Sequence, residues 1–321
     1  MRTPIRLACC FAALIAGTSP AQAQRAYPDK PARLIVPFAP GGGTDIIARV
    51  LSVHLTEAFG HSVIVDNRPG AGGRIGEEMI VRASPDGYTL GMVSGYGTNA
   101  AIYKLPYDPV NDIQAVIAVG EAGFVISLHP SVQAKTIGDL IALARASPGK
   151  LNYGSSGTGA ITHLSSALFD LMAGINTTHV PFKGTGPALA ALLGGQVEFM
   201  LGSMPATAPH VKAGRLRGVA VTTKKRSSAL PDIAPLGDTV PGYEAVIVYG
   251  VTGPKGVPAE AVRVWNSAVN KVLTTAQMKE RLVADGIEAV GGAPSVMHEA
   301  VKRDVEKWRR VVRDAKLTFS S

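Results

Sequence analysis

A regular alternation of strand-like and helix-like segments dominates the chain from residue 33 onwards. Buried strands are predicted at 33–38, 62–66 and 88–94, because these runs are short, apolar and bounded by turn-forming residues. Amphipathic helices are predicted between them at 44–59 and 74–83. Strands that alternate with helices form a parallel sheet covered on both faces, so the sequence predicts an open α/β fold.

The alternation is interrupted once and then resumes. Two strands with little between them, at 113–119 and 124–128, indicate a crossing into a second lobe. Further strands are predicted at 151–153, 178–180, 197–201, 216–222, 243–251 and 287–290, and helices at 136–146, 160–173, 187–193, 206–213, 259–274, 276–284 and from 294. A chain of 321 residues has room for about two domains. We predict two α/β lobes with a cleft between them, lobe 1 over 24–122 and 225–321 and lobe 2 over 123–224.

The first 23 residues have the features of an export signal. Arg2 and Arg6 form a short basic region, residues 7–16 are apolar, and residues 21–23 read Ala-Gln-Ala, an A-x-A cleavage site. A buried N-terminal helix is the alternative, but the three features occur in the order typical of a signal peptide. We expect residues 1–23 to be removed and the mature chain to begin at Gln24.

Removal of that signal takes away the two cysteines of the chain, Cys9 and Cys10. A mature chain without cysteine has no disulfide, no thiolate metal site and no cysteine nucleophile. Loss of Arg2 and Arg6 lowers the net charge from +8 to +6, a modest basic excess concentrated at 224–226 and in the predicted last helix. A nucleic-acid-binding face is the alternative, but interleaved aromatic residues are missing, so we expect a solvated surface and no nucleic-acid partner.

Three glycine-rich loops each follow a predicted strand and precede a helix, at 40–45, 154–159 and 183–186. In open α/β sheets ligands bind beyond the carboxyl ends of strands, where helix N-termini present free N–H groups and a partial positive charge. If the lobes close on each other, these donors converge on one small anion, and a carboxylate is the simplest candidate. Each loop alone is equally well an ordinary capped turn, whereas three at matching positions favour binding.

Three side chains in these loops have two interpretations each. Thr44 caps a helix or donates its hydroxyl to a ligand. Asp45 meets an amine or hydroxyl of the ligand, or it complements the helix dipole. Lys183 pairs with a ligand carboxylate, or it is a solvated surface residue. The residues alone leave these alternatives open.

Nucleotide-binding and catalytic motifs are absent from the sequence. Residues 70–76 resemble G-x-G-x-x-G but carry Ile75 in place of the last glycine, and no P-loop occurs. Residues 154–158 lack the final glycine of G-x-S-x-G, and no H-E-x-x-H exists. The seven histidines show no metal spacing, so His163 is predicted to form hydrogen bonds at a helix start. We expect no catalytic site, no cofactor and no metal.

Several motifs, in order along the chain, resemble the Bug receptors, the extracytoplasmic solute-binding proteins of tripartite tricarboxylate transporters. The first is Val-Pro-Phe-Ala-Pro-Gly-Gly-Gly-Thr-Asp at 36–45, followed by Val-Asp-Asn-Arg-Pro-Gly-Ala-Gly-Gly at 65–73 and Pro-Asp-Gly-Tyr at 85–88. The others are Leu-Pro-Tyr-Asp-Pro at 105–109, Leu-Asn-Tyr-Gly-Ser-Ser-Gly at 151–157, His-Val-Pro-Phe-Lys-Gly at 179–184 and Leu-Gly-Gly-Gln-Val at 193–197. The similarity covers essentially the whole mature chain.

This resemblance implies a two-lobed Venus-flytrap receptor that captures a small carboxylate in the cleft and is not an enzyme. Family members bind through the loop that here spans 38–45 and the second-lobe loop at 155–158, largely with main-chain N–H groups. Residues 183–185 and the end of the third strand would complete the pocket. The predicted site residues are Phe38, Pro40, Gly41, Gly42, Gly43, Thr44, Asp45, Ser94, Asn99, Ser155, Ser156, Gly157, Thr158, Lys183, Gly184, Thr185 and Ser203.

The chain departs from the family pattern at three places. Members usually carry Asp and Asn before a Leu-Pro where this chain has Gly-Ser-Met-Pro at 202–205, and many carry Trp where it has Val248. The usual Pro-Thr near residue 235 reads Ala-Pro at 234–235. We hypothesise that the smaller groups at 202 and 248 widen the pocket for a bulkier, aromatic carboxylate, so no relative's ligand is carried over.

The resemblance and the export signal together predict a periplasmic receptor that hands a small carboxylate to the membrane subunits of a tripartite tricarboxylate transporter. A ligand sensor of the same fold, signalling through a membrane histidine kinase, is the alternative. An exported hydrolase would need a nucleophile and a base in contact, which the motifs do not provide. We expect a monomer. Which carboxylate is bound stays open.

Overall fold

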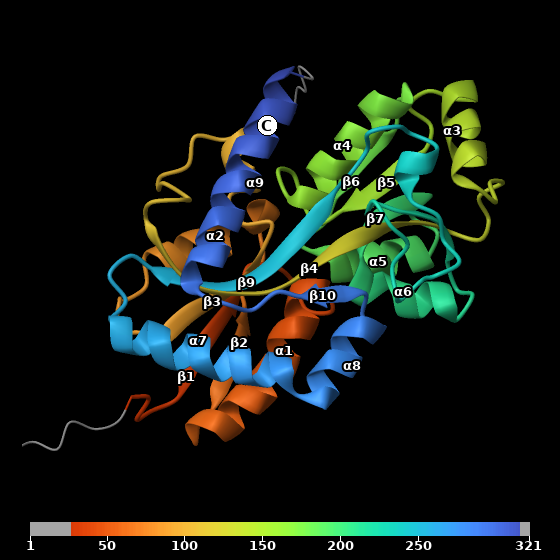
Figure 1. The fold of residues 1–321 in the computed structure, drawn as a ribbon. Coiled ribbons are helices and arrows are strands. Elements are labelled where there is room, and N and C mark those ends of the chain that lie inside the picture. Colours follow the sequence, from red (N-terminus) through yellow and green to blue (C-terminus); the bar gives the residue numbers. More distant parts are fainter. Residues whose placement is uncertain (1–26, 315–321) are drawn as a thin grey trace, which may run out of the picture.

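The computed structural model describes residues 27–314, so the predicted signal peptide at 1–23 lies outside the described residues. The strands form one continuous sheet in the order β2-β1-β3-β9-β4-β7-β5-β6, and β8 and β10 both pair with β4 (Figure 1). In the described part of the chain, no helix is long and apolar enough to cross a membrane.

One half of the sheet begins with the predicted parallel strands β1 (Ala32–Val36), β2 (Val63–Asn67) and β3 (Thr89–Ser94). The strand β9 (Val246–Pro254) runs antiparallel to β3. This half is completed by β10 (Ile287–Ala289) and by the helices α1 (Gly43–Phe59), α2 (Arg74–Val81), α7 (Ala259–Thr274), α8 (Ala276–Ala284) and α9 (Pro294–Asp314). The predicted parallel unit is confirmed to within one or two residues at the ends of its strands.

Alternate residues of β1 pack on opposite faces of the sheet, as the period of a strand requires. Ile35 belongs to a buried cluster with Ile80 of α2 and Val301 of α9. Leu34 and Val36 join a separate cluster with residues of α1 and α7. The predicted apolar stripe of the last helix is confirmed, since Val301, Val305 and Trp308 are buried and Val312 is partly buried against the core.

The other half of the sheet contains β5 (Asn152–Ser155), β6 (Thr178–Pro181), β7 (Phe199–Ser203) and β8 (Arg217–Val221). Its helices are α3 (Ile137–Ala146), α4 (Ile161–Ala173), α5 (Thr185–Leu193) and α6 (Met204–Lys212). Three short 3-10 helices were not predicted: η1 (Ala71–Gly73), η2 (Thr98–Ala101) and η3 (Leu236–Asp238).

The two predicted strands at 113–119 and 124–128 are one strand, β4 (Ile113–Leu128), so this prediction is wrong. Its first part pairs with β9 and β10, and its last five residues pair with β7 and β8. The glycines that interrupt the apolar pattern do not end the strand. A Cβ on Gly120 would stand 2.8 Å from the carbonyl oxygen of Glu288, so glycine lets β10 approach β4.

The long strands β4 and β9 thus run from one half of the sheet towards the other, as Figure 1 shows. A strand that pairs in both halves connects two lobes without a flexible linker. The lobe boundaries at 122/123 and 224/225 stay a prediction.

Candidate functional site

A small enclosed cavity lies where the two halves of the molecule meet. Its volume is about 20 Å³, enough for about one water molecule. Its lining comes from the β1–α1 loop, the ends of β3 and β7, the strands β4 and β9, and the first turns of α4 and α5. The lining residues are Phe38, Gly42, Gly43, Thr44, Ser94, Phe124, Thr162, Thr185, Ser203, Ile247 and Tyr249.

The N-terminus of α1 forms one wall of this cavity. The backbone N–H of Gly43 donates to Ser203 Oγ at 3.2 Å, and a Cβ on Gly43 would stand 2.7 Å from the Tyr249 hydroxyl. The position therefore requires glycine. The N-cap is Gly42 and not Thr44, whose hydroxyl is 2.6 Å from the hydroxyl of Ser94. The capping interpretation of Thr44 is wrong.

The carboxylate of Asp45 is buried and fully engaged by its own half of the molecule. It accepts hydrogen bonds from the Gly41 N–H at 3.0 Å, from Arg49 Nε at 3.0 Å and from Asn67 Nδ2 at 2.9 Å. Burial raises the pKa of Asp45, but these hydrogen bonds outweigh it and hold the pKa below its ordinary value. Asp45 thereby fixes the shape of the loop before α1.

A network of buried polar groups fixes the second glycine-rich loop. The Gly157 N–H donates to Ser155 Oγ at 3.1 Å, and Ser155 Oγ lies 2.6 Å from His179 Nε2. Thr162 Oγ1 accepts from the Ser156 N–H at 2.9 Å. The Gly159 N–H donates to Nδ1 of His163, the third residue of α4, which confirms the hydrogen-bonding role predicted for this histidine.

The rings of His163 and His179 stack with their centroids 3.9 Å apart. Burial lowers the pKa of His163 to about 3 and that of His179 to about 4, so both rings are neutral at pH 7. The Ser155–His179 contact brings together a hydroxyl and an imidazole. This is a pairing of nucleophile and base that no sequence motif predicted. Ser155 is fully buried, and its hydroxyl oxygen already bonds the loop, so the pair orders the loop and presents no nucleophile to a substrate.

Hydrogen bonds and close backbone contacts join the loops around the cavity. The Ala39 N–H donates to the carbonyl oxygen of Lys183 at 2.9 Å, and Thr98 Oγ1 donates to the carbonyl oxygen of Gly159 at 3.2 Å. A Cβ on Gly186 would stand 2.2 Å from the carbonyl oxygen of Pro40. The loops at 37–43 and 183–186 therefore touch backbone to backbone, which bulkier residues would prevent.

Seven of the predicted site residues line the cavity: Phe38, Gly42, Gly43, Thr44, Ser94, Thr185 and Ser203. The others are absent from its lining: Pro40, Gly41, Asp45, Asn99, Ser155, Ser156, Gly157, Thr158, Lys183 and Gly184. Lys183 meets the opposite loop through its backbone, and its side chain is exposed. Asn99 is fully buried, and its Nδ2 donates to the carbonyl oxygen of Gly72 at 3.0 Å.

Four lining residues were not predicted from the sequence: Phe124, Thr162, Ile247 and Tyr249. Ile247 and Tyr249 alternate along a predicted strand, so the period of two could have placed them on one face. The hypothesis that residues 202 and 248 widen the pocket is wrong. A Cβ on Gly202 would stand 2.1 Å from Thr207 Oγ1, and Val248 packs in the cluster that contains Val301 of α9.

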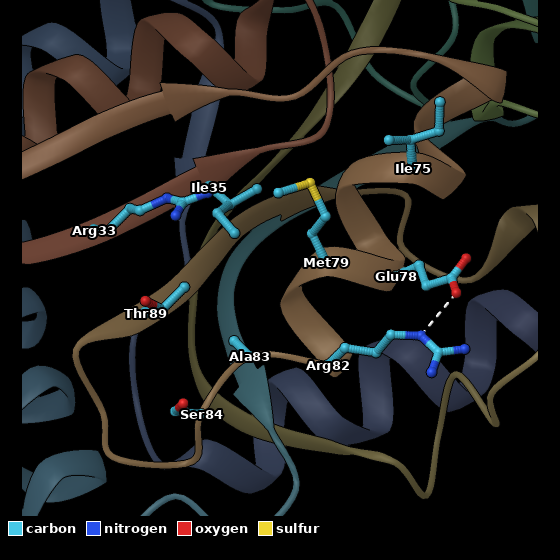
Figure 2. Close-up of a pocket in the computed structure, with 9 residues that line it drawn as sticks. All are labelled: Arg33, Ile35, Ile75, Glu78, Met79, Arg82, Ala83, Ser84 and Thr89. Carbon is cyan, nitrogen blue, oxygen red and sulfur yellow. Dashed lines mark hydrogen bonds and ion pairs between the residues drawn. The ribbon is translucent and has the colours of Figure 1, made fainter.

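A larger hollow of about 520 Å³ lies elsewhere, beside α2 and the strands β1 and β3 (Figure 2). Ile35, Ile75 and Met79 form its apolar part, and Glu78 and Arg82 pair with each other at its edge. None of the three glycine-rich loops lines this hollow. Within residues 27–314, no group of three or more His, Cys, Asp or Glu side chains is arranged to hold a metal ion.

Two α/β lobes joined by long strands, with a cavity between them, define the two-lobed periplasmic-binding-protein fold. The chain belongs to the tripartite tricarboxylate transporter receptor family, because the model of that family matches residues 47–317. The resemblance to the Bug receptors is thereby confirmed. The family is one of solute-binding receptors and not a class of enzymes.

Three solved structures are similar to the chain over most of its length. The periplasmic binding protein BugD is 31% identical with a TM-score of 0.87, over 90% of this chain and 99% of BugD. R. palustris Rpa4515 with adipate is 35% identical with a TM-score of 0.87, over 90% and 98% of the two chains. MatC (Rpa3494) from Rhodopseudomonas palustris with bound malate is 28% identical with a TM-score of 0.85, over 89% and 100%.

The close approach of Gly186 to Pro40 predicts that Gly186→Ala weakens closure and ligand binding. The added Cβ would overlap the Pro40 carbonyl oxygen, and overpacking costs about 1–3 kcal/mol. The affinity for a small acid such as adipate or malate, measured by calorimetry, should therefore fall roughly 5- to 150-fold. Gly138→Ala is the matched control, because Gly138 also occupies the second position of a helix and has only Thr136 Oγ1 nearby, at 3.7 Å. Equal affinities of the two variants would contradict this prediction.

The two buried histidines predict a loss of stability in acid. Their pKa values are lower in the folded chain than in the unfolded chain, so their stabilisation is complete above about pH 6.5. It is lost as the pH falls towards 4 and 3. His179→Gln keeps an acceptor for Ser155 and removes one titration. Between pH 7 and 4 the unfolding free energy of the wild type, from urea titrations, should fall by about 2 kcal/mol more than that of the variant. If the unfolding free energies of the wild type and His179→Gln fall equally between pH 7 and 4, the contribution assigned to His179 is contradicted.

Proposed function

We propose that the chain is an exported periplasmic receptor that binds a small carboxylate between its lobes and delivers it to the membrane subunits of a tripartite tricarboxylate transporter. One observation carries the proposal. The first residues of α1 and α5, the second residue of α4 and the N-cap residue of α6 all line one cavity; these are Gly43, Thr185, Thr162 and Ser203.

Helix N-termini present N–H groups without intrahelical partners and a partial positive charge, which favours an anion. No Lys, Arg, His, Asp or Glu side chain is among the described residues that line the cavity. A bound anion would therefore be held by N–H groups and hydroxyls alone. The adipate of Rpa4515 and the malate of MatC support a carboxylate as that anion.

The cavity is too small for such an acid while the loops at 37–43 and 183–186 touch. We propose that the lobes part to admit the ligand and close over it, moving about the strands β4 and β9. The proposal includes the lobe boundaries given above, removal of residues 1–23, a monomeric receptor without nucleic-acid partner, and no catalytic activity. A sensor acting through a histidine kinase would use the same cavity and differ in its membrane partner.

A thermal-shift screen of the chain from Gln24, unfolded and refolded to remove any copurified ligand, tests this proposal. Adipate, malate, citrate and benzoate are the first probes, and the neutral diamide of adipate is the control for charge. An acid at a hundredfold excess over its dissociation constant should stabilise the fold by about 2.7 kcal/mol. The Gly43→Ala variant should lose the shift, because the added Cβ would overlap the Tyr249 hydroxyl.

The receptor proposal fails if no acid in the panel raises the melting temperature of the refolded wild type. It also fails if the diamide stabilises the fold as well as adipate does, since the site would then not recognise charge.

A further inference from the structure

The hydroxyl of Tyr249 is buried without a hydrogen-bond partner among the described residues. The side chain belongs to β9, is fully buried and lines the cavity. Ser203 Oγ lies beside the hydroxyl, but the two groups do not have hydrogen-bond geometry. A buried polar group without a partner costs free energy, so such a group in a cavity points to a ligand.

The groups around this hydroxyl are donors. The Gly43 N–H already donates to Ser203 Oγ, which leaves the Ser203 hydroxyl hydrogen to be donated. The first turn of α1 adds N–H groups without intrahelical partners. Burial raises the pKa of Tyr249 well above its ordinary value, so its hydroxyl keeps its proton and can donate. This end of the cavity therefore fits a group that only accepts hydrogen bonds.

We propose that Tyr249 binds the ligand, its hydroxyl donating a hydrogen bond to a carboxylate oxygen seated at the N-terminus of α1. The inference rests on the proposed function and adds the residue that selects a carboxylate over a carboxamide. A carboxamide replaces one acceptor oxygen by an NH2 donor, which would face the donors of Tyr249 and Ser203 and leave one of them unpaired. Discrimination of this kind follows from buried polar groups left without partners.

Tyr249→Phe tests the inference because it should act with opposite signs on two measurements. Without ligand, the variant should unfold at the same or a higher urea concentration than the wild type, since an unsatisfied hydroxyl is removed. Its affinity for adipate or malate, measured by calorimetry, should fall about ten- to a hundredfold, because a hydrogen bond to a charged acceptor is lost. The preference for adipate over its diamide should shrink together with the affinity.

Tyr96→Phe is the matched control. Its hydroxyl is also buried without a partner among residues 27–314, and its ring packs in the cluster with Val301 and Val305 of α9, away from the cavity. This variant should change the stability as Tyr249→Phe does, and it should bind adipate and malate with the affinity of the wild type. A loss of affinity in the control equal to that of Tyr249→Phe would overturn the assignment.

The outcomes separate the two proposals. If the wild type binds neither adipate nor malate nor another acid of the panel, the proposed function fails and the role of Tyr249 fails with it. If the wild type binds an acid and Tyr249→Phe binds it equally well, only the role of Tyr249 is overturned. Should the variant unfold early, the wild type still decides, because equal affinities for adipate and its diamide would contradict selection by donors.

Discussion

An anion can leave water for the interior of a protein only if donors replace its hydration, because burying an unpaired charge is very costly. The cavity between the lobes has donors and, among its described lining residues, no charged side chain. That constraint accounts for the main features of the site. Helices must begin at the cavity so that their free N–H groups reach it, and Gly43 must lack a side chain so that Ser203 and Tyr249 can approach.

Donors supplied by loops are useful only if the loops are held in place before binding. The carboxylate of Asp45 ties Gly41, Arg49 and Asn67 together before α1, and the Ser155–His179 pair does the same for the second loop. Asp45 and Ser155 are themselves buried, and neither lines the cavity. The charged and reactive side chains therefore shape the loops, while backbone and hydroxyl groups face the proposed ligand.

Most strands and helices and the three loops could be predicted because each depends on local sequence, whereas the continuous strand β4 and the three 3-10 helices could not. The period of two placed β1 and β3, and glycines between strand and helix located the loops at 40–45 and 154–159. The contributions of Phe124 and Tyr249 to the cavity could not be predicted in this way, since they depend on long-range strand pairing. Phe124 pairs with Ser203 of β7, and Tyr249 pairs with Ser94 of β3. The error at Val248 has a related origin, because adjacent residues of a strand point to opposite faces and Ile247 and Tyr249 are the ones that line the cavity. Ser155 and His179 are 24 residues apart and lie on the neighbouring parallel strands β5 and β6, so no short sequence motif contains both.

The hydrogen bond from Gly43 to Ser203 joins α1 of one lobe to the N-terminus of α6 in the other. In the proposed receptor Ser203 takes part in both contacts, since its hydroxyl accepts from Gly43 and can donate to the acid. An acid that accepts hydrogen bonds from Ser203 and Tyr249 would add to the few hydrogen bonds that hold the lobes together at the rim. A ligand shifts a conformational equilibrium only by its difference in affinity between the two states. Because the open cleft would separate Gly43 from Ser203, the full set of donors exists only in the closed state, and occupancy and closure become linked.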